Sequence, residues 1–82
     1  MPTYLDPADR ECLDRLRRND GASVQDLCEE FGLTPTAIRQ RLSRILELGL
    51  VRREALRLEG RGRPRHIYHV TKRGLKELGN NY

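Results

Sequence analysis

Two short apolar stripes with helical spacing, separated by one glycine turn, constrain this chain more than any other feature of its sequence. The first stripe follows the positions i, i+3, i+4 and i+7 and consists of Val24, Leu27, Cys28 and Phe31. The second follows i, i+4, i+7 and i+8 and consists of Ile38, Leu42, Ile45 and Leu46. Gly32 suits the left-handed end of the first helix, and Thr34 and Pro35 suit the cap and first residue of the second. The sequence therefore predicts helix, tight turn, helix, which is the spacing of a helix-turn-helix motif.

The residues before this motif predict one further helix and a well-defined start for the next. Asp6 can cap a helix whose first residue is Pro7, because proline at that position costs no hydrogen bond. This helix is expected to end at the turn formed by residues 19–21. Ser23 is expected to cap the following helix, with Asp26 three residues on as a weaker form of the capping box.

The residues after the motif change their pattern from helical to extended. A strand is expected over residues 50–58 and a returning strand over 66–70, and Thr71 caps a short last helix. Between the strands lies a segment of alternating glycine, arginine and proline, here called the Gly/Arg loop (residues 59–65). The predicted order is helix, helix, helix, strand, loop, strand, helix. This is a mainly α fold with a small β-hairpin (α+β), built as a single domain over residues 1–82.

Basic residues are concentrated in the second part of the chain. The 82 residues include 16 Lys and Arg against 12 Asp and Glu, a net charge of +4. Up to Leu33, four arginines stand against eight acids (net −4), whereas from Thr34 onward twelve cations stand against four acids (net +8). Ten of these twelve cations are arginines, which form bidentate contacts with phosphates and guanine edges. This distribution favours a nucleic-acid partner and predicts that the acidic first helix faces away from it.

Several classes of protein are not expected. A chain of this length forms one small core and leaves no room for an active site between domains, so an enzyme is not predicted. The longest apolar run is two residues, so neither a membrane helix nor a signal peptide is expected, and the location is predicted to be cytoplasmic. Cys12 and Cys28 fall on apolar stripes and are expected to be small buried hydrophobes. His66 and His69 lie an odd number of residues apart on a strand and hence on opposite faces, so neither a metal site nor a cofactor is predicted.

The outward face of the helix expected over residues 35–48 carries groups that can read DNA bases. Glutamine pairs bidentately with adenine, arginine with guanine, and the methyl groups of threonine and alanine contact thymine. The candidate base-contacting residues are Thr36, Ala37, Gln40, Ser43 and Arg44. Thr34, Arg39 and Arg41 are candidates for contacts to phosphates or flanking bases. On this helix alone, an ordinary solvated face explains the pattern equally well.

The Gly/Arg loop shifts the balance towards nucleic acid. Arg61, Arg63 and Arg65 alternate with glycine and proline, so each cation lies on a backbone away from any core. Such a loop between two strands can reach along a groove and contact phosphates or a narrow minor groove. A solvated loop tip explains the exposure, but it does not explain why the six consecutive residues 60–65 contain three arginines and no acid.

The chain from Ser23 to Tyr82 resembles the winged helix-turn-helix domain of bacterial transcriptional regulators. More narrowly, four strings are similar to the N-terminal domain of SufR-type and related DeoR/MarR-like repressors: LTPTAIRQRL (33–42), LGLV (48–51), GRGRPR (60–65) and YHVTKRG (68–74). The resemblance implies that the helix over 35–48 is the recognition helix in the major groove and that the Gly/Arg loop is the wing. It implies an iron–sulfur cluster and dimerising helices only for a longer parent protein, because those parts of SufR-type regulators lie beyond this domain.

The sequence therefore predicts sequence-specific binding to double-stranded DNA in transcriptional regulation. The alternative is a winged-helix protein-interaction module that docks an acidic partner, since a fold does not fix a function. The acid-free outer face and the Gly/Arg loop favour DNA. A homodimer is expected mainly through elements beyond this chain, because Leu75 and Leu78 are the whole of the apolar seam that the last helix offers.

Overall fold

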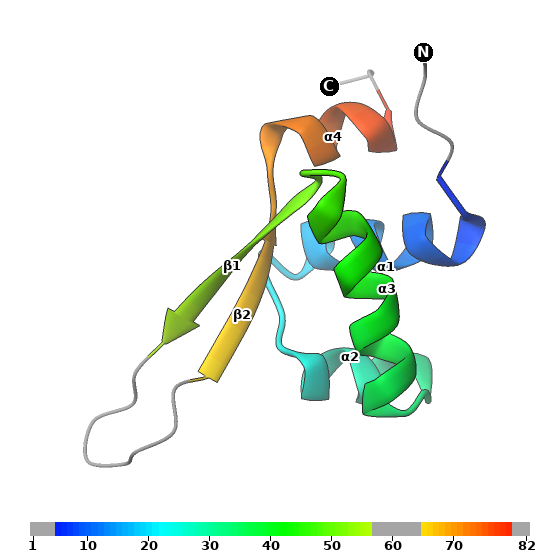
Figure 1. Ribbon diagram of the computed structural model, residues 1–82, viewed down its shortest axis with the longest axis vertical. Helices are drawn as coiled ribbons and strands as arrows, with labels where there is room; N and C mark the ends of the chain where they lie inside the picture. The colour runs from blue at the N-terminus through cyan, green and yellow to red at the C-terminus, as the bar shows by residue number, and fades with distance from the viewer. Residues whose placement is uncertain (1–4, 57–64, 80–82) are drawn as a thin grey trace.

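The computed structural model describes residues 5–56 and 65–79 as a group of helices from which a two-stranded hairpin extends to one side (Figure 1). The elements are α1 (Pro7–Arg18), α2 (Val24–Phe31), α3 (Pro35–Glu47), β1 (Val51–Leu56), β2 (Arg65–Val70) and α4 (Lys72–Leu78). This order confirms the predicted mainly α fold with a small β-hairpin.

The first two helices begin at the predicted caps. Ahead of α1, the Asp6 carboxylate accepts a hydrogen bond from the N–H of Ala8 at 3.1 Å. At α2, the Ser23 hydroxyl accepts from the N–H of Asp26, and the Asp26 carboxylate accepts from the N–H of Ser23, both at 3.1 Å. Two N–H groups that the helix leaves without partners are thus satisfied reciprocally. Aspartate therefore completes the capping box here.

The connection between α2 and α3 is the predicted tight turn. Gly32 has φ of +67°, in the left-handed region that glycine enters without steric cost, and its N–H donates to the Cys28 carbonyl at 2.8 Å. The Thr34 hydroxyl then accepts from the N–H of Ala37 at 3.2 Å, and Pro35 is the first residue of α3. The helix-turn-helix geometry therefore follows from these local caps.

The two strands form an antiparallel pair whose register runs from Val51 opposite Val70 to Leu56 opposite Arg65. β1 was expected to continue two residues beyond Leu56, but those residues lie outside the described part of the chain. β2 begins at Arg65, which had been assigned to the Gly/Arg loop. That assignment is corrected, because Arg65 occupies a position in the strand register.

The apolar stripes of the first three helices meet in a core that the start of β1 closes. Its fully buried side chains are Cys12, Leu13, Leu16, Leu27, Ile38, Leu42, Ile45 and Leu50. Tyr68 of β2 is 8% exposed and reaches this core, whereas Phe31 and Leu46 pack against it and stay partly buried. The backbone of Tyr68 also pairs with that of Ala22, with N···O distances of 2.8 and 3.1 Å. The core and this bridge hold the hairpin in place beside α2 and α3.

The last helix closes the base of the hairpin against the other helices. Thr71 caps α4 as predicted, since its hydroxyl accepts from the N–H of Gly74 at 3.1 Å. The same hydroxyl donates to the Gly49 carbonyl at 2.7 Å, which joins the start of α4 to the end of α3. Arg10 of α1 donates from Nη1 to the Leu78 carbonyl at 3.2 Å. These contacts secure both ends of α4.

Candidate nucleic-acid interface

The outward surface of α3 is hollowed, and this α3 hollow collects most of the predicted base-contacting residues. Its lining consists of Thr36, Arg39, Gln40, Ser43 and Arg44. All five residues are exposed. Four of them belong to the five candidates for base contacts, and Arg39 is a candidate for a phosphate or flank contact. The structure therefore brings short polar groups and two guanidinium groups onto one surface.

Three predicted residues lie beside the α3 hollow. Thr34 uses its hydroxyl to cap α3 through the N–H of Ala37, and Ala37 itself is half-buried. Arg41 is also half-buried, on the side of α3 towards the core thiol of Cys12. Burial raises the pKa of that thiol to about 11, and the positive charge of Arg41 opposes this rise. The side chains of Ala37 and Arg41 are thus less exposed to a ligand than those of the residues that line the hollow.

Arg44 is held by α1, a contact that sequence reasoning did not find. Its Nε lies 2.8 Å from Oδ2 of Asp9 and its Nη2 lies 2.9 Å from Oδ1, so the two side chains form a bidentate pair. The Asp9 side chain is 5% exposed and the Arg44 side chain 51%. The hydrogen bonds from Arg44 to this carboxylate, together with its charge, raise the pKa of the Arg44 guanidinium above its ordinary value. Asp9 of the acidic first helix therefore packs against α3, and the expectation that this helix faces away from a nucleic-acid partner stays a prediction.

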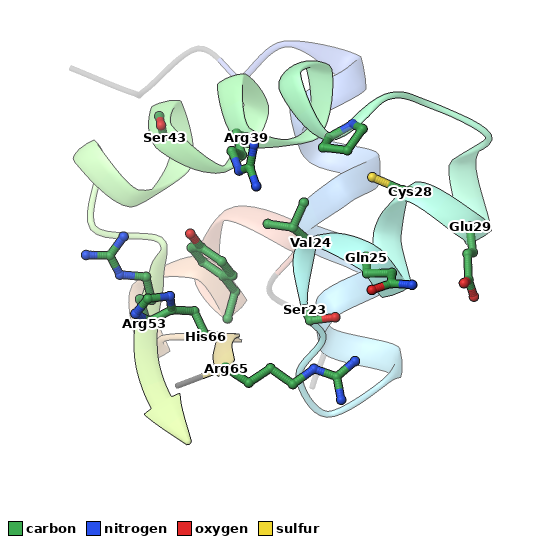
Figure 2. A pocket seen from close by; sticks show the side chains of 12 residues that line it. Ser23, Val24, Gln25, Cys28, Glu29, Arg39, Ser43, Arg53, Arg65 and His66 are labelled. Atoms are coloured by element: carbon green, nitrogen blue, oxygen red, sulfur yellow. The ribbon is translucent and has the colours of Figure 1, made fainter. Parts of the chain in front are cut away.

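A cleft of about 890 Å³ lies between α2 and α3 on one side and the hairpin on the other (Figure 2). This hairpin cleft is lined by Ser23, Val24, Gln25, Cys28, Glu29, Pro35, Arg39, Ser43, Arg53, Arg65, His66 and Tyr68. Arg39, Arg53 and Arg65 line it from α3, β1 and β2 (Figure 2). Among the lining residues that the structure describes, Glu29 is the one acid. The cleft therefore has an excess of positive charge and adjoins the α3 hollow through Arg39 and Ser43.

The strand alternation decides which hairpin side chains reach this cleft. Arg53 lies opposite Tyr68 in the register, and His66 lies two residues before Tyr68, so the three share one face. On the other face, Nε2 of His69 lies 3.3 Å from Oε1 of Glu54. The prediction that the two histidines lie on opposite faces is confirmed.

Of the three predicted wing arginines, Arg65 alone lies in the described part of the chain, and Arg61 and Arg63 lie outside it. Arg65 is exposed and lies across the cleft from the first turn of α2 (Figure 2). Hydrogen bonds from the backbone and hydroxyl of Ser23 lower the pKa of Asp26 in that turn, and the charge of Arg65 acts in the same direction. The electrostatic field of Arg65 thus extends to the capping box of α2.

Sequence reasoning missed Arg53, His66 and Gln25 as lining residues of a candidate site. A signal for Arg53 was present, because it lies two residues after the buried Val51 and therefore on the inward face of its strand. Deciding that this face borders a cleft required the placement of the hairpin against α2 and α3. No comparable signal singled out Gln25, which lies in the first turn of a short helix.

Neither a metal centre nor a membrane span is found in the residues that the structure describes. Within residues 5–56 and 65–79, no three His, Cys, Asp or Glu side chains gather where they could hold a metal ion. No helix in those ranges is long and apolar enough to cross a bilayer. Cys12 is fully buried as expected, whereas Cys28 is only half-buried and lines the hairpin cleft.

A tight helix-turn-helix, an exposed second helix of that motif and a β-hairpin across a basic cleft together define the winged helix-turn-helix class of proteins. A family model described as the MarR family matches residues 5–62. This chain belongs to the MarR family.

Individual relatives agree with this assignment. An uncharacterised HTH-type transcriptional regulator of Pyrococcus horikoshii, PH1916, is 31% identical over 51 residues, which are 62% of this chain and 34% of the relative. A crystal structure of MarR is 32% identical with a TM-score of 0.77, and the match covers 90% of this chain and 48% of the MarR chain. A cysteine mutant of MarR from E. coli complexed with operator DNA is 19% identical with a TM-score of 0.75, and the match covers 90% of this chain and 51% of that one. The chain thus spans about a third of the curated relative and about half of these two structures.

Proposed function

We propose that this chain binds double-stranded DNA in a sequence-specific way as the single DNA-reading domain of a transcriptional regulator, with α3 in the major groove and the hairpin on the adjacent groove or backbone. The observation that carries this proposal is the continuity of the α3 hollow with the hairpin cleft. The hollow holds groups that can pair with bases, and the cleft beside it holds three arginines from three different elements. A polyanion that presents base edges within a charged backbone fits both surfaces at once.

The roles divide by chemistry along this surface. Thr36, Ala37, Gln40, Ser43 and Arg44 would contact bases. Thr34, Arg39 and Arg41 would contact phosphates or flanking bases, and Arg61, Arg63 and Arg65 would hold the neighbouring groove. Among these residues, Gln40 and Ser43 have the most direct support, because they are exposed in the α3 hollow and have small or flat polar ends.

Membership of the MarR family and the solved complex of E. coli MarR with operator DNA support this proposal. Both observations agree with a DNA-binding role. The narrower resemblance to SufR-type and DeoR-like repressors stays a prediction. Action as a repressor in the cytoplasm and assembly into a homodimer belong to the same proposal. An iron–sulfur cluster would require residues beyond this chain.

The salt dependence of duplex binding tests the proposal. Each cation that neutralises a phosphate contributes about −0.9 to the slope of log affinity against log salt concentration, so several contacts require a steep negative slope. The slope is measured by fluorescence anisotropy of a labelled random-sequence duplex titrated with the chain. A flat slope would refute binding through the basic surface.

The division between a reading helix and an anchoring wing has its own test. Gln40→Ala should relax the preference among duplex sequences, whereas Arg63→Ala should weaken all sequences about equally. Arg18→Ala is the matched control for the charge change, because Arg18 lies on α1 and pairs with Asp14 with an N···O distance of 3.0 Å. Equal behaviour of the Gln40 and Arg63 variants would contradict the division of roles.

The protein-interaction alternative predicts a different footprint. Chemical shifts of Thr36 to Arg44 should move when duplex DNA is added to the labelled chain. If these shifts stay unchanged while an acidic peptide perturbs them, the surface serves a protein partner instead.

A further inference from the structure

Asp9 is a buried carboxylate that the proposed division of roles does not use. It lies in the first turn of α1 and is 3% exposed, whereas Glu11 of the same helix is exposed and Asp14 is half-buried. Both of its oxygens accept hydrogen bonds from Arg44, at 2.8 and 2.9 Å. The contact joins α1 to α3 across 35 positions of sequence. A buried acid aimed at one residue of the α3 hollow calls for a role connected with that hollow.

The geometry of the pair leaves one edge of the Arg44 guanidinium available. Arginine has five N–H donors, and Asp9 engages the edge formed by Nε and Nη2. The outer edge, formed by Nη1 and the second hydrogen of Nη2, can still donate two parallel hydrogen bonds. The side chain is half-exposed and lines the α3 hollow with Gln40 and Ser43. Two parallel donors are what the O6 and N7 acceptors of guanine match.

Separation of the pair would be unfavourable. An Arg44 that swung away from α1 would remove both hydrogen bonds from the Asp9 carboxylate, whose side chain is 5% exposed in the pair, and the loss of a charged partner at such a site is unfavourable. The guanidinium is therefore expected to meet DNA while still bound to Asp9. In that state the rotamers of a long side chain are fixed before binding, so less freedom is lost when the base contact forms.

We propose that Asp9 is a positioning residue that fixes Arg44 so that the outer edge of its guanidinium reads a guanine in the recognised sequence. This inference rests on the proposed function and adds to it a residue outside the reading helix. It also assigns the base class that Arg44 recognises.

The experiment compares four variants on the sequence that the unmodified chain selects from a random-sequence duplex library. Affinity is measured for the selected duplex and for duplexes in which each guanine in turn is changed. Arg44→Ala should lower the affinity for the selected duplex about tenfold and remove the preference at one guanine. Asp9→Asn should reduce the preference at the same guanine, and combining the two should do no more than Arg44→Ala alone. Asp14→Asn is the matched control, because Asp14 lies on α1, pairs with Arg18 and lies outside the α3 hollow.

A second variant keeps the test valid if Asp9→Asn does not fold, which circular dichroism would show. Arg44→Lys retains the charge but has no planar fork, so it should retain affinity for random duplexes and lose the guanine preference. Unchanged preference in this variant would overturn the inference, and so would a uniform loss of affinity for all duplexes on Arg44→Ala. Tighter specific binding by Asp9→Asn would mean that Asp9 withholds Arg44 from DNA. If the unmodified chain selects no sequence at all, the proposed function itself fails, which is a separate result from these.

Discussion

Replacement of Arg53 tests whether the hairpin cleft faces the DNA backbone. Arg53 is exposed on β1, lies opposite Tyr68 and lines the cleft with Arg39 and Arg65. No acid in the described part of the chain forms an ion pair with it. The change Arg53→Gln therefore removes one positive charge that no described carboxylate neutralises, while the side chain keeps its approximate length.

The expected magnitude follows from counterion release. If Arg53 neutralises one phosphate, its loss makes the slope of log affinity against log salt shallower by about 0.9. Between about 50 and about 200 mM salt, the unmodified chain should then lose about 3.5-fold more affinity than the variant. Fluorescence anisotropy with one labelled duplex across a salt series resolves a difference of this size.

The neighbouring residue provides a matched control. Arg52 carries the same charge on the same strand, but its side chain points to the opposite face, and its Nη1 lies 4.0 Å from Oε1 of Glu54. Arg52→Gln should therefore leave the slope nearly unchanged. Equal changes for the two variants would mean that only the total charge matters, and the reasoning from strand alternation would be refuted.

Three further predictions concern stability and reactivity. Hydrogen bonds from Ser23 lower the pKa of Asp26 in the folded chain, so the charged carboxylate stabilises the fold at pH values above its ordinary pKa of 3.8. This stabilisation is lost as the pH falls through the lowered pKa of the folded state. Urea unfolding at several pH values should therefore show a weaker acid dependence for Asp26→Asn than for the unmodified chain. At pH 8 a thiol reagent should modify the half-buried Cys28 rapidly, and Cys12, whose pKa burial raises to about 11, only after denaturant is added; equal rates would contradict this. In α4, Gly74→Ala should reduce the free energy of unfolding by about 1–3 kcal/mol, because the new Cβ would overlap the backbone carbonyl of Leu50, the residue before β1. Thermal melts with Lys76→Ala as the control would measure this loss.

The helices of this fold could be predicted because their limits are set by local chemistry. Asp6, Ser23, Thr34 and Thr71 each satisfy N–H groups two or three residues away, so their spacing alone specifies where a helix begins. Gly32 ends α2 by adopting the left-handed conformation, and its N–H donates to the Cys28 carbonyl within the same helix. This helix end therefore also depends on local contacts alone. These contacts are short in sequence, and the structure confirms all of them.

The parts of the candidate site that could not be predicted depend on contacts between distant residues. Arg53 and His66 line the cleft only because the bridge between Ala22 and Tyr68 holds the hairpin beside α2. The helical periodicity of residues 35–48 placed Arg44 on the outward face of α3. It could not show that the Asp9 carboxylate of α1 would bind Arg44 there. The local sequence pattern therefore identifies most of the residues that line the α3 hollow, but it cannot identify the residue that positions Arg44.

The separation of charge along the chain has a more specific consequence than attraction to a polyanion. Uniformly basic surfaces bind DNA without preference, because phosphate contacts are the same in every sequence. An arginine adds to selectivity when it is held in one orientation, and a carboxylate that accepts two of its hydrogen bonds is an effective restraint. Within the residues that the structure describes, Asp9 of the acidic part supplies such a restraint, and Arg44 of the basic part is the residue that it holds. Under the proposed function the two halves would act together, because the cleft arginines would contribute affinity and the Asp9–Arg44 pair would contribute discrimination between bases.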